Sequence, residues 1–173
     1  TFLIPYYAVF TFIGPLIEAS AGNNPEVRSA FLVIYGLGAV AGNYLGGYLN
    51  DRIGAYRTLF VLCIVEAALL PLFAVIPLPL VAFALLVAAC PIFAFAFMVP
   101  QQSRLVTIAP HAASLILSLN AAMLYVGVSA GSASGSSILA WQGLAALGIA
   151  GGVGTLLALV HLVSSERAIA RAP

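Results

Sequence analysis

Long apolar runs, broken by short polar or proline-containing segments, are the main pattern of this chain. A helix needs about 20 apolar residues to cross the hydrocarbon core of a bilayer. The runs are continuous rather than alternating, which favours membrane helices over barrel strands. The sequence therefore predicts six transmembrane helices, at about 1–19, 26–49, 58–76, 80–99, 111–134 and 144–163.

The segments between these runs contain residues that end helices. Residues 21–25 read Ala-Gly-Asn-Asn-Pro, and Pro77 and Pro79 mark a short turn. Residues 100–110 are expected to form a polar connector that holds Arg104, and residues 164–167 a polar tail after the last helix.

The composition supports a membrane protein and excludes several other classes. The chain is 63% hydrophobic and 6% charged, whereas an ordinary soluble domain has about 25% charged residues. A soluble chain of this length could not bury so much apolar surface in one core. The fold class is therefore all-α and polytopic. No basic cluster for nucleic acid is present, and we expect no cofactor.

The residues that bind metals or form disulfides are few and scattered. His111 and His161 have no carboxylate or thiol partner at ligand spacing, so no metal site is predicted. Cys63 and Cys90 both fall inside apolar runs, where packed free thiols are the usual state. The chain also begins with Thr1 inside an apolar run, so we expect it to be a piece of a longer protein.

The arginines predict how the helices are oriented. Six helices place both ends of the segment on one side of the membrane, and the opposite side holds only Arg28. Basic residues are enriched in cytoplasmic loops, so the arginine-rich side should be cytoplasmic. That side holds Arg52, Arg57, Arg104, Arg167 and Arg171.

Two of the predicted helices carry glycine at every fourth residue. This spacing places the glycines on one helix face and lets a neighbouring helix approach closely. The two helices would hold equivalent places if the chain were two inverted three-helix repeats, at about 1–76 and 80–163. Ordinary tight packing explains the glycines equally well. The residues are Gly38, Gly42 and Gly46 in one helix, and Gly127, Gly131 and Gly135 in the other.

The turn between the second and third predicted helices is the densest charged segment of the chain. Gly54 can take the positive φ that redirects a helix end. Asp51 is placed to accept hydrogen bonds from a nearby helix N-terminus. Arg52 and Arg57 can pair with carboxylates or with lipid headgroups. A conformational gate is one interpretation of this turn, and a bare turn with no gating role is the other.

This turn resembles the loop signature of the major facilitator superfamily, G-x-x-x-D-R/K-x-G-R-R/K. Gly47, Asp51, Arg52 and Gly54 match the signature, whereas Ala55 and Tyr56 stand where basic residues are usual and Arg57 comes one place late. The weakened form is typical of the loop between helices 8 and 9 of that family. Further similar stretches follow in order, at 100–105, 109–114, 119–120 and 127–135, although His111 stands where the family often has Glu.

The whole chain therefore resembles the C-terminal half, helices 7 to 12, of a major facilitator transporter of the drug or sugar efflux type. This resemblance implies a multi-pass protein of the inner or plasma membrane that exchanges a small-molecule substrate for protons by alternating access. It implies an N-terminal six-helix half as partner. Helices 7 and 10 would line the cavity, 8 and 11 would form the seam with the other half, and 9 and 12 would face lipid.

Two carboxylates are candidates for proton coupling. Glu66 lies near the middle of the third predicted helix, where an ionised carboxylate is costly, so it should be protonated or paired. A neutral carboxyl bonded to a neighbouring helix is the other interpretation. Glu18, near the outer end of the first helix, is either part of an outer gate or a solvated acid at a helix end.

Hydroxyl and amide side chains are candidates for the substrate cavity. Tyr6, Tyr7 and Thr11 lie on the first predicted helix and could contact an amphipathic or sugar-like substrate. An aromatic belt at the membrane interface would give the same tyrosines. Asn120 matches a residue pattern of the family, and its alternative role is to join helices.

Two other functions remain open at this point. One is a structural or assembly subunit that transports nothing, with a self-pairing half-transporter as a variant. The other is an intramembrane serine protease built on Ser134 and His161. The protease fits poorly, because Ser132 stands where that motif needs Gly and His161 lies near a helix end. We therefore do not expect an enzyme.

Overall fold

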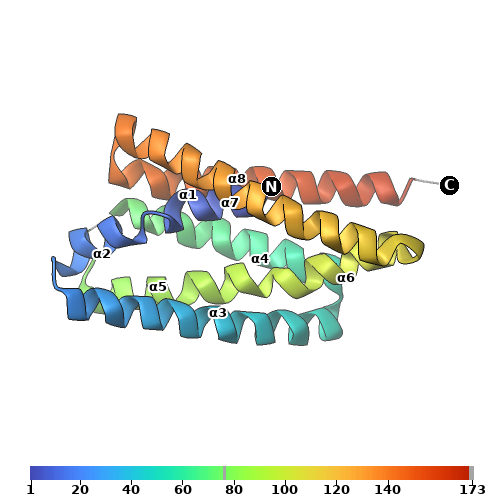
Figure 1. Cartoon of the computed structure of the whole chain (residues 1–173), viewed down its shortest axis with the longest axis horizontal. Helices are drawn as coiled ribbons and strands as arrows, with labels where there is room; N and C mark the ends of the chain where they lie inside the picture. Colours follow the sequence, from blue (N-terminus) through green and yellow to red (C-terminus); the bar gives the residue numbers. More distant parts are fainter. Residues whose placement is uncertain (76, 172–173) are drawn as a thin grey trace.

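Every regular element of this computed structural model is a helix within the part it describes, residues 1–75 and 77–171. The long helices run side by side along the longest axis of the molecule (Figure 1). The all-α prediction is therefore confirmed. The elements are α1 (Leu3–Phe10), α2 (Ile13–Ala21), α3 (Pro25–Ile53), α4 (Ala55–Leu69), η1 (Leu70–Val75), α5 (Leu80–Ala96), α6 (Met98–Ile108), η2 (Pro110–Ala112), α7 (Ala113–Gln142) and α8 (Leu144–Ile169).

The number of membrane crossings agrees with the prediction of a polytopic protein. Five helical segments are long and apolar enough to span a bilayer, and the bent pair of α1 and α2 makes a sixth if it is one span. The five are Pro25–Ile53, Ala55–Val75, Leu80–Ile108, Pro110–Gln142 and Leu144–Ile169.

The predicted polar connector at 100–110 is wrong, because most of it is helical. Helix α6 runs from Met98 to Ile108, and the chain turns only at Ala109 and η2. Pro100 lies in the first turn of α6, where its missing N–H would have no intrahelical partner in any case. The proline therefore does not stop the helix, and the polar residues after it continue the backbone hydrogen bonding.

Helix ends elsewhere also extend past the apolar runs that predicted them. Helix α3 continues to Ile53, α7 to Gln142 and α8 to Ile169, so the expected tail at 164–167 is helical. Apolar character marks only the part of a helix that lies in hydrocarbon. The backbone hydrogen bonds do not depend on it, so the helix continues into the polar ends.

The first predicted helix, at 1–19, is not continuous. It breaks at Thr11 and Phe12, and α1 and α2 are bent by 46° relative to each other. Pro15 explains the break, because it has no N–H for the carbonyl of Thr11 and its ring would clash with that carbonyl in a straight helix. Phe12 accordingly leaves the helical region, with φ −104° and ψ 24°.

Helix α3 packs closely on α5 through its glycines. A Cβ at Gly38 would lie 2.8 Å from the carbonyl oxygen of Ala88. At Gly42 and Gly46 a Cβ would overlap the α5 backbone at Ile92 and Ala96. Because a Cβ has no room here, the two helices touch backbone to backbone along much of their length.

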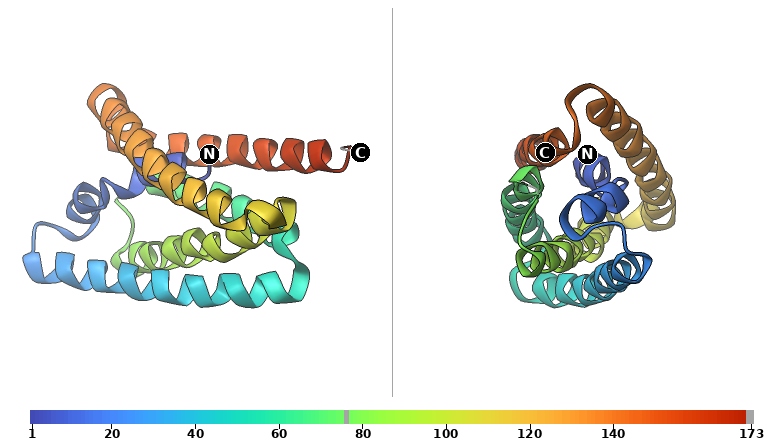
Figure 2. Two further views of the ribbon diagram at one scale, coloured as in Figure 1. Left: turned by 45° about the vertical axis from the view of Figure 1, so that its right-hand side comes forward. Right: turned by 90° about the vertical axis from the view of Figure 1, so that its left-hand side faces the viewer.

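Helix α7 packs on α1 in the same way. A Cβ at Gly131 would lie 2.6 Å from the carbonyl oxygen of Ile4, and one at Gly135 would overlap Ala8. In the end-on view of Figure 2, α1 and α2 lie in the middle of the bundle, surrounded by the other helices. The core is centred there, and it includes Phe2, Tyr6, Val9 and Phe10 of the first span.

A third close contact joins α8 to α4 and η1. A Cβ at Gly148 would lie 2.6 Å from the backbone nitrogen of Ala74, and one at Gly152 would overlap the ring of Pro71. Three pairs of helices are therefore held at short distance by glycine: α3 with α5, α7 with α1, and α8 with α4 and η1.

Substitution of Gly42 tests the contact between α3 and α5. Gly42→Ala should lower the free energy of unfolding by about 1–3 kcal/mol, because the added methyl group must push the Ile92 backbone away. Gly36, also in α3, is the matched control because nothing lies within 4 Å of its Cβ position. Gly36→Ala should change stability by no more than about 1 kcal/mol. Thermal unfolding in detergent would measure both, and equal melting temperatures would contradict the close packing.

Candidate functional site

The turn between α3 and α4 reverses the chain at one glycine. Gly54 has φ +83°, a conformation that L side chains rarely adopt, and its N–H donates to the carbonyl of Asn50 at 3.0 Å. The hydroxyl and the N–H of Thr58 both donate to the Gly54 carbonyl, at 2.8 and 3.1 Å. These bonds fix the two helices in a tight antiparallel arrangement with no loop between them.

The charged residues of this turn are exposed and make no ion pair with other described residues. Asp51 and Arg52 belong to the last turn of α3, and Arg57 to the first turn of α4. The guanidinium of Arg52 lies 5.3 Å from the ring centroid of Tyr48, in a cation–π contact on its own helix. Among the described residues, no hydrogen bond from a helix N-terminus to the Asp51 carboxylate is found.

Gly47 lies on the same face of α3 as Asp51, one turn earlier. In contrast to Gly46, it has nothing within 4 Å of its Cβ position. Gly46 therefore serves the contact with α5, whereas Gly47 faces away from the described part of the bundle.

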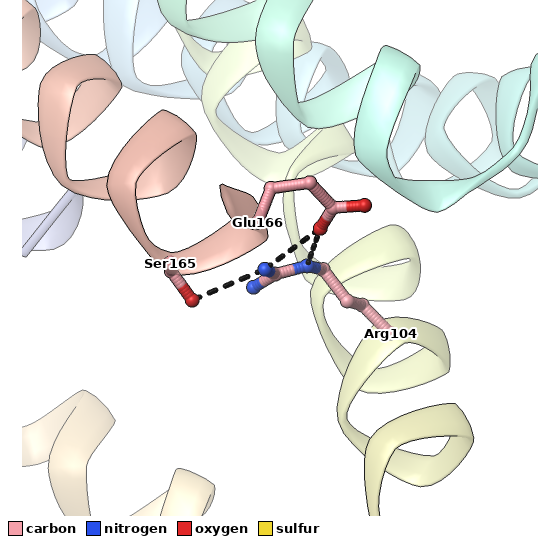
Figure 3. Close-up of polar contacts among 3 residues, drawn as sticks. All are labelled: Arg104, Ser165 and Glu166. Atoms are coloured by element: carbon pink, nitrogen blue, oxygen red, sulfur yellow. Dashed lines mark hydrogen bonds and ion pairs between the residues drawn. The ribbon is translucent and has the colours of Figure 1, made fainter. Parts of the chain in front are cut away.

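An ion pair joins α6 to α8 beside this turn, as Figure 3 shows. Arg104 donates to one carboxylate oxygen of Glu166 from Nη2 at 3.0 Å and from Nε at 3.3 Å, and also from Nη2 to the Ser165 hydroxyl at 3.1 Å. The Arg104 side chain is 11% exposed. Sequence analysis missed Glu166, because 62 residues separate the partners and no pattern connects them.

Two hollows of about 350 Å³ each lie against Arg104. One extends to the turn between α3 and α4, where Asn50, Gly54 and Tyr56 line it. The other extends into the bundle toward α1 and α7, and half-buried Asn120 is part of its wall. The polar side chains of this second hollow are Thr1, Cys63, Gln101, Arg104, Asn120, His161 and Ser165.

Glu66 is the one acidic side chain that is fully buried in the described residues, with 0% exposure. Neither carboxyl oxygen has a hydrogen-bond partner there, and the backbone of Ala94 in α5 lies nearby without hydrogen-bond geometry. An ionised carboxylate in such surroundings would cost several kcal/mol. The geometry therefore favours a carboxyl group that carries its proton, with Tyr6 and Tyr35 within electrostatic reach.

The tyrosines of the first span differ in their surroundings. Tyr6 is 1% exposed, donates its hydroxyl to that of Tyr35 at 3.3 Å and stacks on Phe10. Tyr7 is half-buried, and its Cβ lies beside Gly131 of α7. Tyr6 is therefore part of the packed core, and Tyr7 lies at the edge where α1 meets α7.

Thr11 lies at the break between α1 and α2, and it is exposed. Its hydroxyl is 2.8 Å from that of Ser132 in α7. Sequence analysis did not select Ser132 as a site residue. The proline four residues after Thr11 was the available signal, since it indicates a break in an otherwise apolar span.

Glu18 lies at the opposite end of the bundle from Arg104, where α2 meets α3. Its carboxylate is 3.7 Å from the guanidinium of Arg28, which also donates to the side chain of Asn23 at 3.1 Å. Both partners are more than a third exposed, and a pair of this kind contributes at most about 1 kcal/mol.

The described residues hold no group of three or more side chains suited to a metal ion. Cys63 and Cys90 are free and buried. The Ser134 hydroxyl donates to the carbonyl of Gly131 in its own helix at 2.9 Å. This is the packing of an ordinary helix serine and not the arrangement of an activated nucleophile.

Comparison with known proteins gave relatives but no family model and no solved structure that matches. The chain is 24% identical over 155 residues to the uncharacterized MFS-type transporter YbcL of Bacillus subtilis (strain 168). It is 28% identical over 164 residues to the inner membrane transport protein YdhP of Escherichia coli (strain K12). It is 27% identical over 157 residues to a probable sugar efflux transporter of Helicobacter pylori (strain G27).

These matches cover 90%, 93% and 91% of the chain. They cover only 40%, 41% and 40% of the relatives, so the chain spans about two fifths of their length. The relatives are named as transporters and not as enzymes. With the apolar helices of the fold, the matches confirm the resemblance drawn from the turn: the chain is a homologue of the MFS-type transporters and corresponds to a C-terminal half of such a protein.

Proposed function

We propose that the chain is the C-terminal six-helix half of a secondary transporter that exports a small molecule by alternating access. The observation that carries this proposal is an exposed face of α3 that ends at the free carboxylate of Asp51. A transport function agrees with the names of the relatives, one of which is a probable sugar efflux transporter.

The exposed face of α3, which we call the α3 stripe, has the spacing of a helix seam. Its residues follow one another at alternating intervals of four and three, as they do where one helix lies along another. Tyr44 is 81% exposed and Val40 71%. The stripe consists of Val33, Leu37, Val40, Tyr44, Gly47 and Asp51.

Lipid could cover the apolar part of this stripe, but two of its residues favour a protein partner. Gly47 leaves room for a close backbone contact, and Asp51 has no partner among the described residues. A helix N-terminus of the other half, packed along the stripe, would supply both the contact and the N–H groups for the carboxylate.

Helix α7 contributes a second part of the same seam. Its buried residues are Gly127, Gly131 and Gly135, which face α1, and on other sides of the helix Leu115, Leu119, Tyr125 and Val126 are exposed. Helices α3 and α7 thus resemble each other: each packs on a neighbouring helix through a row of glycines, and each has exposed residues on another face. This agrees with the expectation that the second and fifth spans form the seam with the other half.

The helix pairs also support an internal repeat. The second span packs on the fourth, as α3 does on α5, and the fifth packs on the first, as α7 does on α1. The third and sixth spans, α4 and α8, pack on each other. Exchange of spans one to three with spans four to six reproduces these pairs, as expected of two inverted three-helix repeats.

The end of the bundle that holds the α3–α4 turn is proposed to be cytoplasmic. Arg52, Arg57, Arg104 and Arg167 lie at this end, and Arg28 lies at the other. An excess of arginine marks the cytoplasmic side of membrane proteins.

Glu66 is the proposed proton-carrying group of this half. It is buried between α4 and α5 without a hydrogen-bond partner, so a change in the packing of these helices would change its access to water. A carboxyl group that is neutral when buried and ionised when wetted would couple proton movement to the change in conformation.

The gating role of Asp51 is tested by Asp51→Asn in vesicles that contain the whole transporter. Turnover should fall by up to about thirtyfold, because the amide keeps the shape but loses the attraction of the carboxylate to a helix N-terminus, at most about 2 kcal/mol. Substrate affinity should stay within about twofold. Glu26→Gln is the matched control, since Glu26 is an exposed acid at the opposite end of the same helix. Unchanged turnover in Asp51→Asn would exclude the gating role.

The proton role of Glu66 is tested by Glu66→Gln, which keeps the side-chain volume but carries no exchangeable acid proton. Efflux should lose its response to an imposed pH gradient, whereas exchange of substrate between the two sides, with no net proton movement, should continue. Glu18→Gln serves as control, because Glu18 forms only an exposed pair with Arg28. A normal pH response in Glu66→Gln would refute the proposal, and its loss in Glu18→Gln would assign the role to Glu18 instead.

A further inference from the structure

The break between α1 and α2 leaves a backbone carbonyl without a partner in the middle of a membrane span. The Thr11 carbonyl accepts no hydrogen bond among the described residues, because Pro15 has no N–H. Thr11 stands near the centre of the segment from Leu3 to Ala21. An unpartnered carbonyl in hydrocarbon costs several kcal/mol, so irregular backbone at this depth occurs only where it faces protein or water. Since Thr11 is exposed, the break should face a water-filled path and not lipid.

The hydroxyl oxygens of Thr11 and Ser132 are two further hydrogen-bond acceptors at the break, beside the Thr11 carbonyl. The Ser132 hydroxyl donates to the carbonyl of Val128 at 2.9 Å, which uses its only proton. The 2.8 Å contact between Thr11 and Ser132 is then a bond from the Thr11 hydroxyl to the Ser132 oxygen. Both hydroxyl oxygens keep a free lone pair, so the break presents three neutral acceptors within a short distance of one another.

Tyr7 completes the surroundings with a donor and an aromatic ring. It lies one turn before Thr11 on the same face of α1, and its Cβ is beside Gly131, the neighbour of Ser132. It is half-buried, and no hydrogen-bond partner of its hydroxyl is found in the described residues. An aromatic ring next to neutral acceptors suits a ligand that has both an apolar face and hydroxyl groups.

The charge of the surroundings decides which ligand fits. No acidic or basic residue lies between Thr1 and Ile17, or between Ala112 and Gln142 in α7. The one charged residue of α2, Glu18, stands seven residues after Thr11 and pairs with Arg28, so it is not free to serve as counter-charge for an ion at the break. Three neutral oxygens are too few for Ca²⁺ or Mg²⁺, which take six or more oxygen ligands. The donors that fit neutral acceptors are the hydroxyl groups of an uncharged molecule.

We propose that Thr11, Ser132 and Tyr7 form a binding site for an uncharged, hydroxyl-rich substrate, a sugar or a polyol, at the break between α1 and α2. This proposal rests on the proposed transport function and names its substrate class. Thr11 and Ser132 hold the hydroxyl groups of the ligand, and the ring of Tyr7 covers its apolar face.

The substrate class is tested with two probes in vesicles that contain the whole transporter, labelled lactose as the neutral sugar and ethidium as a lipophilic cation. Thr11→Val and Ser132→Ala should each raise the KM for lactose about tenfold, the effect of one lost hydrogen bond, and leave ethidium efflux unchanged. Ser137→Ala is the matched control, since Ser137 is an exposed α7 serine that bonds only to the Ala133 carbonyl of its own helix. This variant should behave as wild type with both probes.

Each other result has a definite meaning. Lactose transport that is insensitive to Thr11→Val and Ser132→Ala overturns this inference, and so does a wild type that exports ethidium but not lactose. Both results leave the proposed transport function standing. A wild type that moves neither probe also overturns this inference, because the proposed site should accept a neutral sugar.

Water access at the break is measured by labelling Thr11→Cys with a charged, membrane-impermeant thiol reagent. Rapid labelling that lactose slows is expected, because the position faces the aqueous path. Val153→Cys is the control, an exposed position on α8 that should face lipid and react slowly. Background is low because Cys63 and Cys90 are buried. Equal labelling at both positions, or labelling of Thr11→Cys that lactose does not slow, overturns the inference.

Discussion

Backbone contact at glycine is the constraint on which this bundle depends. Lipid is as apolar as the helices themselves, so burial of apolar side chains cannot hold membrane helices together as it does in water. Van der Waals attraction between closely packed helices holds them together instead. This attraction is greatest where a glycine, which has no Cβ, lets two backbones touch. Gly42 against Ile92 and Gly131 against Ile4 are such contacts. They place α3 on α5 and α7 on α1, and so determine which faces of α3 and α7 remain free.

The free faces carry the features that we connect with transport. The α3 stripe ends at Asp51, whose carboxylate has no partner among the described residues, while Arg104 at the same end is paired with Glu166 of α8. The bundle therefore pairs the arginine that lies between α6 and α8, whereas the Asp51 carboxylate on the outer face has no ion-pair partner among the described residues. This division is expected of a half that must hold its own shape and also dock reversibly on a partner.

Polar groups inside the bundle mark two further places where structure and chemistry meet. Among the described residues, Glu66 has no hydrogen-bond partner at the α4–α5 contact, and the carbonyl of Thr11 has none at the break of the first span. Neither group is at low energy in a dry apolar environment. Binding of a proton lowers the energy of the buried Glu66 carboxyl group, and a hydrogen bond from water or a ligand lowers that of the Thr11 carbonyl. Both groups are accounted for if, as we propose, the interior of the protein is wetted during transport.

The sequence by itself determined the fold class, the number of spans and the turn at Gly54. Each of these follows from local properties: the apolar composition of the chain, the length of its apolar runs, and the positive φ that glycine allows. Helix ends were predicted less well, as α6 and α8 show, because hydropathy reports the membrane boundary and not the last hydrogen-bonded turn.

Only the tertiary structure decided which residues meet. It paired Arg104 with Glu166 and Thr11 with Ser132. It also placed Tyr6 in the core. It packed Gly46 against the α5 backbone and left free space next to Gly47. These outcomes depend on how far each helix is rotated about its axis and on which neighbour it faces. Partners that are 62 or 121 residues apart leave no mark in a local pattern, because their contact arises only when all the helices pack together.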